Sequence, residues 1–271
     1  MSTPDSFRRR FGLRNVPVVA LVTYVIALLA WVAVVGRWLP MPESASGMGT
    51  ETGVGMWMSD PGAPEAMALS NGFVGVALYL CMWGVMMVAM MYPSSVPLFR
   101  LYYRTLDGVR KRGKAARVGA FIGTYALVWT LTGVVPLVVN AVVPIAAVAN
   151  QHGTLLLGGS LLGLSAYQLS PYKYRCLRYC RSPLGFLMGH HRPGVRGAAR
   201  MSWQFSVFCV GCCWALFAFM VVVGSMNVVW MALITVVLSA ERTVAWGERL
   251  AAGVGVLAGV AGVALVVAAT V

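Results

Sequence analysis

Acidic residues are scarce in this sequence. Only 8 of its 271 residues are Asp or Glu, against 21 Lys or Arg and 3 His, and all charged residues together make up 11% of the chain. A soluble domain carries roughly 25% charged residues. The chain is also 59% hydrophobic with a mean hydropathy of +0.77. This shortage of charge excludes an ordinary soluble domain and predicts a polytopic membrane protein.

Further absences restrict the function. The sequence contains no phosphate-binding loop, which argues against transport driven directly by ATP. It also has no Ser/His/Asp set and no paired carboxylates that would indicate hydrolysis, so we expect a protein that is not an enzyme. The basic clusters lack the interleaved stacking aromatics of a nucleic-acid surface, and we expect no nucleic-acid partner. Anionic lipid headgroups account for the same basic residues.

Long apolar runs predict an all-α fold, a transmembrane helical bundle of about seven spans. An apolar run of about 20 residues crosses a bilayer as a helix, which satisfies its own backbone hydrogen bonds in lipid. The alternating pattern of barrel strands is absent. A tight turn near Gly224 joins the fifth and sixth spans into a hairpin, and Asn227 is expected to cap the sixth helix. The predicted spans are 17–39, 72–92, 118–139, 154–170, 202–223, 226–240 and 250–271.

The positions of the basic residues predict the orientation. With the N-terminus in the cytoplasm, seven spans place every Lys and Arg cluster inside, as the positive-inside rule requires, and the C-terminus outside. We therefore expect a multi-pass protein of the cell membrane. Its predicted segments are a basic cytoplasmic N-terminus (1–16), a first anchor (17–39), an outer loop (40–71), a core of spans two to six (72–242) and a C-terminal helix (243–271).

Three cysteines lie on one face of the predicted fifth span. They are Cys209, Cys212 and Cys213, in the stretch FCVGCCWALF. Residues three and four apart share a helix face, and the predicted topology places these thiols in the inner half of the bilayer. Cys176 and Cys180 are also four residues apart, just beyond the cytoplasmic end of the fourth span.

Methionines form a second row of soft ligands. Met82, Met86 and Met90 recur every four residues on one face of the second span, descending toward the level of the cysteines. Thiolates and thioethers select soft metals, so the residues predict a metal site, for Cu(I) first and zinc second. We expect Lys173 and Arg175 to offset the charge of bound thiolates, and Glu241 to lie at the inner interface beside Arg242.

Two other interpretations of these residues stay open. Methionines and cysteines also serve as core packing. The spacing Cys209-Val-Gly-Cys212 is a C-x-x-C, which in a membrane thiol–disulfide oxidoreductase would exchange electrons with a quinone. The cytoplasmic level of the cysteines, where thiols stay reduced, and the extra Cys213 favour metal binding. The partners expected are membrane lipids, a metal ion and a metal donor or acceptor protein.

Several motifs together resemble a known family. The stretches WGVMMVAMMYPSSVP, YQLSPYKYRCLRYCRSPLGF, GCCWALF and SMNVVWMALITVVLSAER are similar to a family of predicted metal-binding integral membrane proteins. It is catalogued as a domain of unknown function, with some members labelled copper chaperones. The resemblance covers about residues 82–242 and implies the ten motif positions Met82, Met86, Met87, Met90, Met91, Cys176, Cys180, Cys209, Cys212 and Cys213.

This chain departs from the family pattern at one point. A His-Gly pair usually stands four residues before the first cysteine of the C-x-x-C-C run, and here those positions are Phe205 and Ser206. If that histidine is a ligand in relatives, this chain lacks it. The resemblance therefore implies metal binding with an affinity or a metal choice of its own.

Overall fold

The computed structural model describes residues 16–36, 38, 60–225 and 227–270. Within these ranges the regular elements are all helices, which confirms the all-α prediction. Part of the expected outer loop, residues 40–59, lies outside the described residues. The helices are α2 (Val16–Val35), α3 (Ala63–Ser70), α4 (Gly72–Thr105), α5 (Lys111–Leu131), α6 (Val134–Val142), α7 (Ile145–Gln168), α8 (Pro171–Arg181), α9 (Pro183–His190), α10 (Gly194–Val222), α11 (Val228–Thr243) and α12 (Gly247–Thr270).

Five helical stretches have the length and apolar composition to cross a membrane. They lie in α2, in α4, in α5 continued by α6, in α10 and in α12, and they coincide with five of the predicted spans. The predicted fourth span coincides with α7. The predicted sixth coincides with α11, whose 16 residues fall short of the roughly 20 needed to cross a bilayer upright. A total of seven spans therefore stays a prediction.

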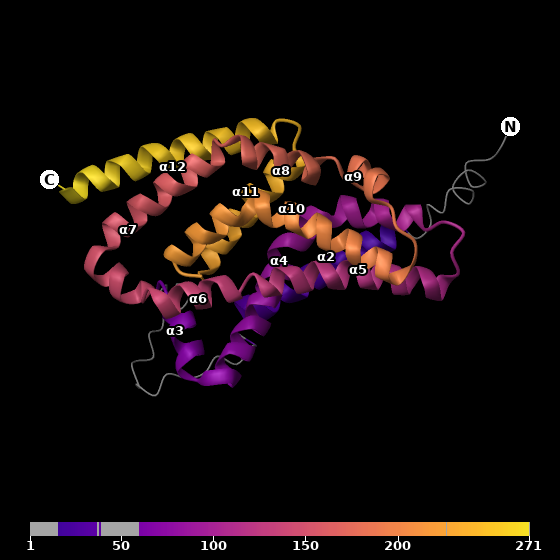
Figure 1. Cartoon of the computed structure of the whole chain (residues 1–271), viewed down its shortest axis with the longest axis horizontal. Coiled ribbons are helices and arrows are strands. Elements are labelled where there is room, and N and C mark those ends of the chain that lie inside the picture. The colour runs from indigo at the N-terminus through magenta and orange to yellow at the C-terminus, as the bar shows by residue number, and fades with distance from the viewer. Residues whose placement is uncertain (1–15, 37, 39–59, 226, 271) are drawn as a thin grey trace.

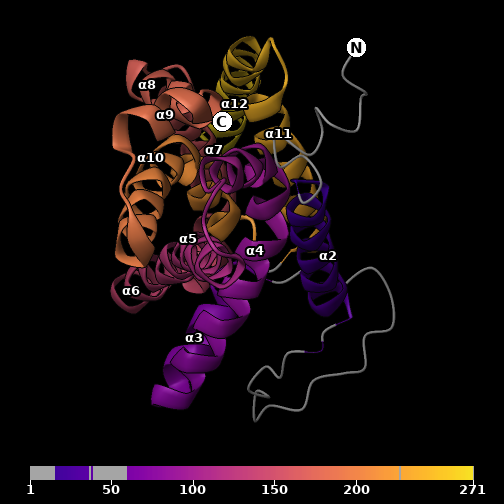
Figure 2. The ribbon, with the colours of Figure 1, turned by 90° about the vertical axis from the view of Figure 1, so that its right-hand side faces the viewer.

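Helix α4 is the central element of the bundle. Its 34 residues extend about 51 Å at the rise of an α-helix. It lies between α2 and α5 (Figure 2). Pro93 lies inside α4 and has no N–H to donate to the carbonyl of Ala89. The indole Nε1 of Trp31 on α2 donates to that carbonyl at 3.0 Å, so α2 supplies the hydrogen bond that the proline removes.

Helices α7 and α12 form an antiparallel pair beside this bundle (Figure 1). Small residues allow the two backbones to approach each other. A Cβ on Gly262 would lie 2.9 Å from the carbonyl oxygen of Gly158, and a Cβ on Gly255 would lie 2.9 Å from Cβ of Gln168. Larger side chains at these positions would therefore push α12 away from α7.

Two tight connections position the short helices. Ser170 caps α8 by accepting a hydrogen bond from the backbone N–H of Lys173 at 3.3 Å, and Pro171 occupies the first turn. Helix α8 packs against α10. Between α10 and α11, Gly224 has φ +107°, a left-handed conformation that favours glycine. Asn227 Oδ1 accepts from the N–H groups of Val229 and Trp230, both at 3.1 Å, which confirms it as the cap of α11.

Candidate functional site

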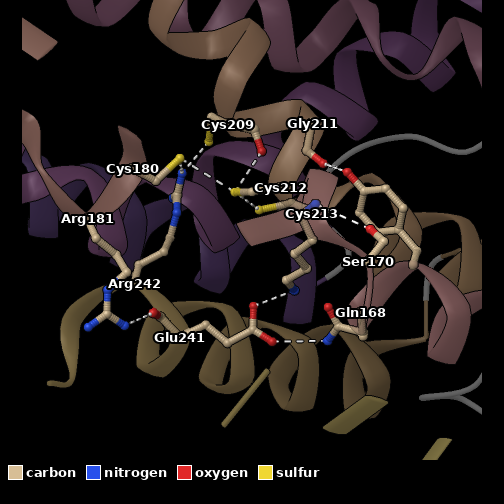
Figure 3. Close-up of polar contacts among 12 residues, drawn as sticks. Gln168, Ser170, Cys180, Arg181, Cys209, Gly211, Cys212, Cys213, Glu241 and Arg242 are labelled. Atoms are coloured by element: carbon tan, nitrogen blue, oxygen red, sulfur yellow. Dashed lines mark hydrogen bonds and ion pairs between the residues drawn. The ribbon is translucent and has the colours of Figure 1, made fainter. Parts of the chain in front are cut away.

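Four of the five predicted inner cysteines lie together between α8 and α10. We call Cys180, Cys209, Cys212 and Cys213 the thiol cluster (Figure 3). The sulfur of Cys212 lies 3.5 Å from that of Cys180 and 3.2 Å from that of Cys213. The three cysteines of α10 are at most 2% exposed, and all of them are free thiols. The shared helix face predicted from their spacing is therefore turned into the protein core.

Cys176 lies at the edge of this cluster. It is half-buried on α8, and its sulfur would lie 3.0 Å from a Cβ on Gly211. Glycine at this position allows α8 to approach the backbone of α10. The Tyr167 hydroxyl donates to the carbonyl of the same Gly211. Burial raises the pKa of the Cys176 thiol above its ordinary value. Within the described residues Cys176 makes no hydrogen bond to another thiol, so it is a neighbour of the cluster rather than a member.

Arg242, at the end of α11, enters the thiol cluster (Figure 3). Its side chain is buried, and its Nη2 donates to Cys209 Sγ and lies 3.6 Å from Cys180 Sγ. Its Nη1 donates to Ser94 Oγ on α4 at 2.7 Å. The expected place of Glu241 and Arg242 at the level of the inner interface stays a prediction, but the Arg242 side chain is buried among helices. Its guanidinium contacts side chains of α4, α8 and α10 at one point.

The basic residues expected to offset the cluster's charge are engaged elsewhere. The Lys173 ammonium donates to Glu241 Oε2 at 2.7 Å, and both side chains are almost fully buried. Gln168 Nε2 donates to the other oxygen of Glu241 at 3.0 Å. Arg175 is exposed, with its guanidinium 5.9 Å from the ring of Tyr172. Arg242, rather than Lys173 or Arg175, therefore contacts the thiols, and Glu241 is buried between Lys173 and Gln168.

A tyrosine connects the thiol cluster to α4 from a second side. The hydroxyl of Tyr125 on α5 lies 3.2 Å from Cys209 Sγ. Ser95 Oγ donates to the same hydroxyl at 2.8 Å. Ser94 and Ser95 are consecutive in α4. Ser94 contacts Arg242 and Ser95 contacts Tyr125, and both Arg242 and Tyr125 contact Cys209. Cys209 therefore contacts side chains of both α5 and α11.

The methionine row lies on α4, the helix that also carries Ser94 and Ser95. Met86 and Met90 are buried and Met82 is half-buried. The spacing of four residues continues from Met90 to Ser94, which binds Arg242. The row thus ends one helical turn from a residue that contacts the guanidinium. The further motif methionines, Met87 and Met91, are also buried.

Phe205 lies one helical turn before Cys209, at the position where the resemblance described above leads one to expect a histidine. Its ring centroid lies 6.2 Å from that of Tyr125 and 5.3 Å from that of Phe186. The hydroxyl of the next residue, Ser206, donates to the carbonyl of Ser202 at 2.8 Å. An aromatic core contact therefore stands where a nitrogen ligand would be adjacent to the thiols.

The known sulfur separations in the thiol cluster are those of hydrogen-bonded thiols. Among the residues described, no group of three or more His, Cys, Asp or Glu side chains has the geometry to hold a metal ion. Tetrahedral zinc with Zn–S bonds of about 2.3 Å places its sulfurs about 3.8 Å apart. The separations of 3.2 Å between Cys212 and Cys213 and of 3.5 Å between Cys180 and Cys212 are shorter.

Sequence reasoning missed Arg242, Tyr125, Ser94 and Ser95 as neighbours of the thiols. One signal for Arg242 was present, because an ionisable residue next to an apolar run in a membrane protein marks a functional site by default. The hydroxyl groups carried no such signal, since Ser and Tyr are common in apolar helices.

Comparison with known families finds one match. A family model described as PpoB2: Copper chaperone matches residues 80–265, which is more than half of the chain. The match includes the thiol cluster, Cys176, Arg242 and the methionine row. Comparison with curated proteins and with solved structures finds no match.

Proposed function

The chain belongs to the PpoB2 copper chaperone family, and we propose that it carries Cu(I) as cargo on the thiol cluster, within a cell membrane. The observation behind this proposal is the convergence of four thiols from two helices, of which the three on α10 are buried and Cys180 is half-buried. Packing alone does not require sulfur at all four positions, whereas thiolates are the preferred ligands of Cu(I).

Cu(I) suits the thiol cluster better than zinc. Structural zinc is bound by four protein ligands in a tetrahedron. The family's histidine position is Phe205 here, and Cys209 already contacts Arg242 and Tyr125. A soft ion that needs fewer ligands is favoured under these conditions. Zinc is the alternative, and it would need all four thiols.

The methionine row and Cys176 are proposed as transfer ligands. Met82, Met86 and Met90 approach along α4, and thioethers bind Cu(I) more weakly than thiolates do. Cys176 is half-buried on α8, where it can exchange metal with a donor or acceptor protein. A series of weaker and stronger ligands lets Cu(I) pass from one ligand to the next while it stays coordinated.

The proposed topology has seven spans with the N-terminus and the basic loops in the cytoplasm. The positive-inside rule supports it, because Arg112 and Arg196 then lie on one side with the other basic clusters. The thiol cluster then lies in the inner half of the bilayer, within the core of residues 72–242. A cytoplasmic partner could reach Cys176 in this arrangement.

Replacing Cys209, Cys212 and Cys213 together with Ser tests the proposal. Serine has nearly the same size but a hydroxyl that is a poor ligand for a soft metal, and in a helix it can bond to the carbonyl four residues back. We expect stoichiometric Cu(I) binding to be lost while membrane insertion is retained. Metal analysis of protein purified under reducing conditions, with competition against a Cu(I) chelator, measures both stoichiometry and affinity.

Cys81 provides the matched control. It lies exposed on α4, so Cys81→Ser should leave Cu(I) binding unchanged. A triple-Ser protein that binds one Cu(I) as tightly as the parent would contradict the site, and the cysteines would then be core packing. A Cys209–Cys212 disulfide trapped by acid during turnover with a quinone would instead support the thiol–disulfide oxidoreductase.

A further inference from the structure

The buried positive charge of Arg242 is the least expected feature of the thiol cluster. Arginine stays protonated in proteins, and a buried charge needs a partner of opposite sign. In the described part of the chain the ion pairs are Lys173–Glu241 and Lys114–Asp107, and neither includes Arg242. The carboxylate of the adjacent Glu241 is held by Lys173 and Gln168.

The neighbours of the guanidinium are sulfur and hydroxyl groups. Nη2 contacts Cys209 and lies 3.6 Å from Cys180, and Nη1 donates to Ser94. The thiol cluster is therefore the place where compensating negative charge can reside. Donors to metal-bound thiolates orient these ligands and tune the metal site.

We infer that Arg242 acts as the counter-cation of the loaded site, so that Cu(I) binding to the thiol cluster depends on the positive charge of this residue. This inference rests on the proposed function. Cu(I) held by two thiolates has one net negative charge, which the guanidinium neutralises. A buried site is least costly when its charges cancel.

Arg242→Gln tests this role, with Arg242→Lys as the conservative variant. We expect the Arg242→Gln protein to bind Cu(I) about 100-fold more weakly. Lysine retains the positive charge, so Arg242→Lys should restore most of the affinity. Arg178→Gln removes an exposed positive charge from α8 and should leave the Cu(I) affinity unchanged.

The measurements are chelator competition for Cu(I), and X-ray absorption for the number of sulfur ligands. The parent should show Cu(I) with two sulfurs. Unchanged Cu(I) affinity in a folded Arg242→Gln protein would overturn the inference while leaving the proposed function intact. Failure of the parent to bind Cu(I) would instead refute the proposed function.

Ser94→Ala provides a second route if Arg242→Gln does not fold. This variant removes the hydroxyl that holds Nη1 but retains the charge. It should weaken Cu(I) binding only several-fold. A loss of Cu(I) affinity in Ser94→Ala as large as that predicted for Arg242→Gln would show that the packing of the side chain, rather than its charge, determines the affinity, and would overturn the inference.

Discussion

Glu241→Gln should destabilise the fold far more than its small change in structure suggests. The substitution conserves shape and retains an acceptor for Gln168, but it leaves the Lys173 ammonium buried without a carboxylate. The two side chains are 0% and 1% exposed and their charged atoms lie 2.7 Å apart. Breaking a buried pair by removing one charge costs about 3–5 kcal/mol. For a domain of this size, that lowers the melting temperature by roughly 6–20 °C.

The chain offers a matched control for this prediction. Lys114 and Asp107 form an ion pair of almost the same length, 2.8 Å, but their side chains are 13% and 46% exposed. Exposed pairs contribute about 0–1 kcal/mol, so Asp107→Asn should shift the melting temperature little. The two substitutions are chemically identical in kind, and only burial distinguishes them.

Thermal unfolding in detergent, followed by the helical circular-dichroism signal, measures both variants. Lys173→Met should be as damaging as Glu241→Gln, and the double variant should recover at least half of the loss, because no unpaired charge remains. If Glu241→Gln were no more destabilising than Asp107→Asn, the burial argument would be refuted. Because Lys173 is on α8, a loosened pair should also weaken Cu(I) binding at Cys180.

Four further predictions concern single features. Met90→Leu conserves core volume and should lower the rate of Cu(I) transfer several-fold, measured by stopped-flow chelator exchange, with little loss of stability. Asn227→Ala removes the cap of α11 and should cost about 1 kcal/mol in thermal unfolding, whereas Asn227→Ser should cost much less. Burial raises the pKa of Cys176, so its reactive thiolate forms at higher pH than in the denatured chain. The rate of its alkylation, measured by mass spectrometry, should therefore rise at a higher pH in the folded protein than in the denatured chain. Single cysteines at Arg196 and His152 should be labelled from opposite sides of the membrane, and labelling of both from outside would contradict the proposed topology.

Much of the local structure was readable from the sequence, because it depends on near neighbours in the chain. The apolar runs predicted the helices, and the spacing of Cys209, Cys212 and Cys213 placed three thiols on one face of α10. Asn227 before an apolar run predicted a cap, and the structure has one. Each of these features is set by the period of the helix or by hydrogen bonds within one turn.

The identity of the groups that meet at Cys209 was decided by tertiary structure. The spacing of Cys176 and Cys180 predicted the same role for both. In the structure Cys176 lies beside Gly211 of α10, and only Cys180 contacts a thiol of the cluster. Glu241 and Arg242 are adjacent in sequence, yet consecutive residues of a helix point about 100° apart. Glu241 therefore faces Lys173, while Arg242 faces the thiols. The directions of these side chains depend on how α4, α8, α10 and α11 cross, and no local pattern in the sequence specifies a crossing.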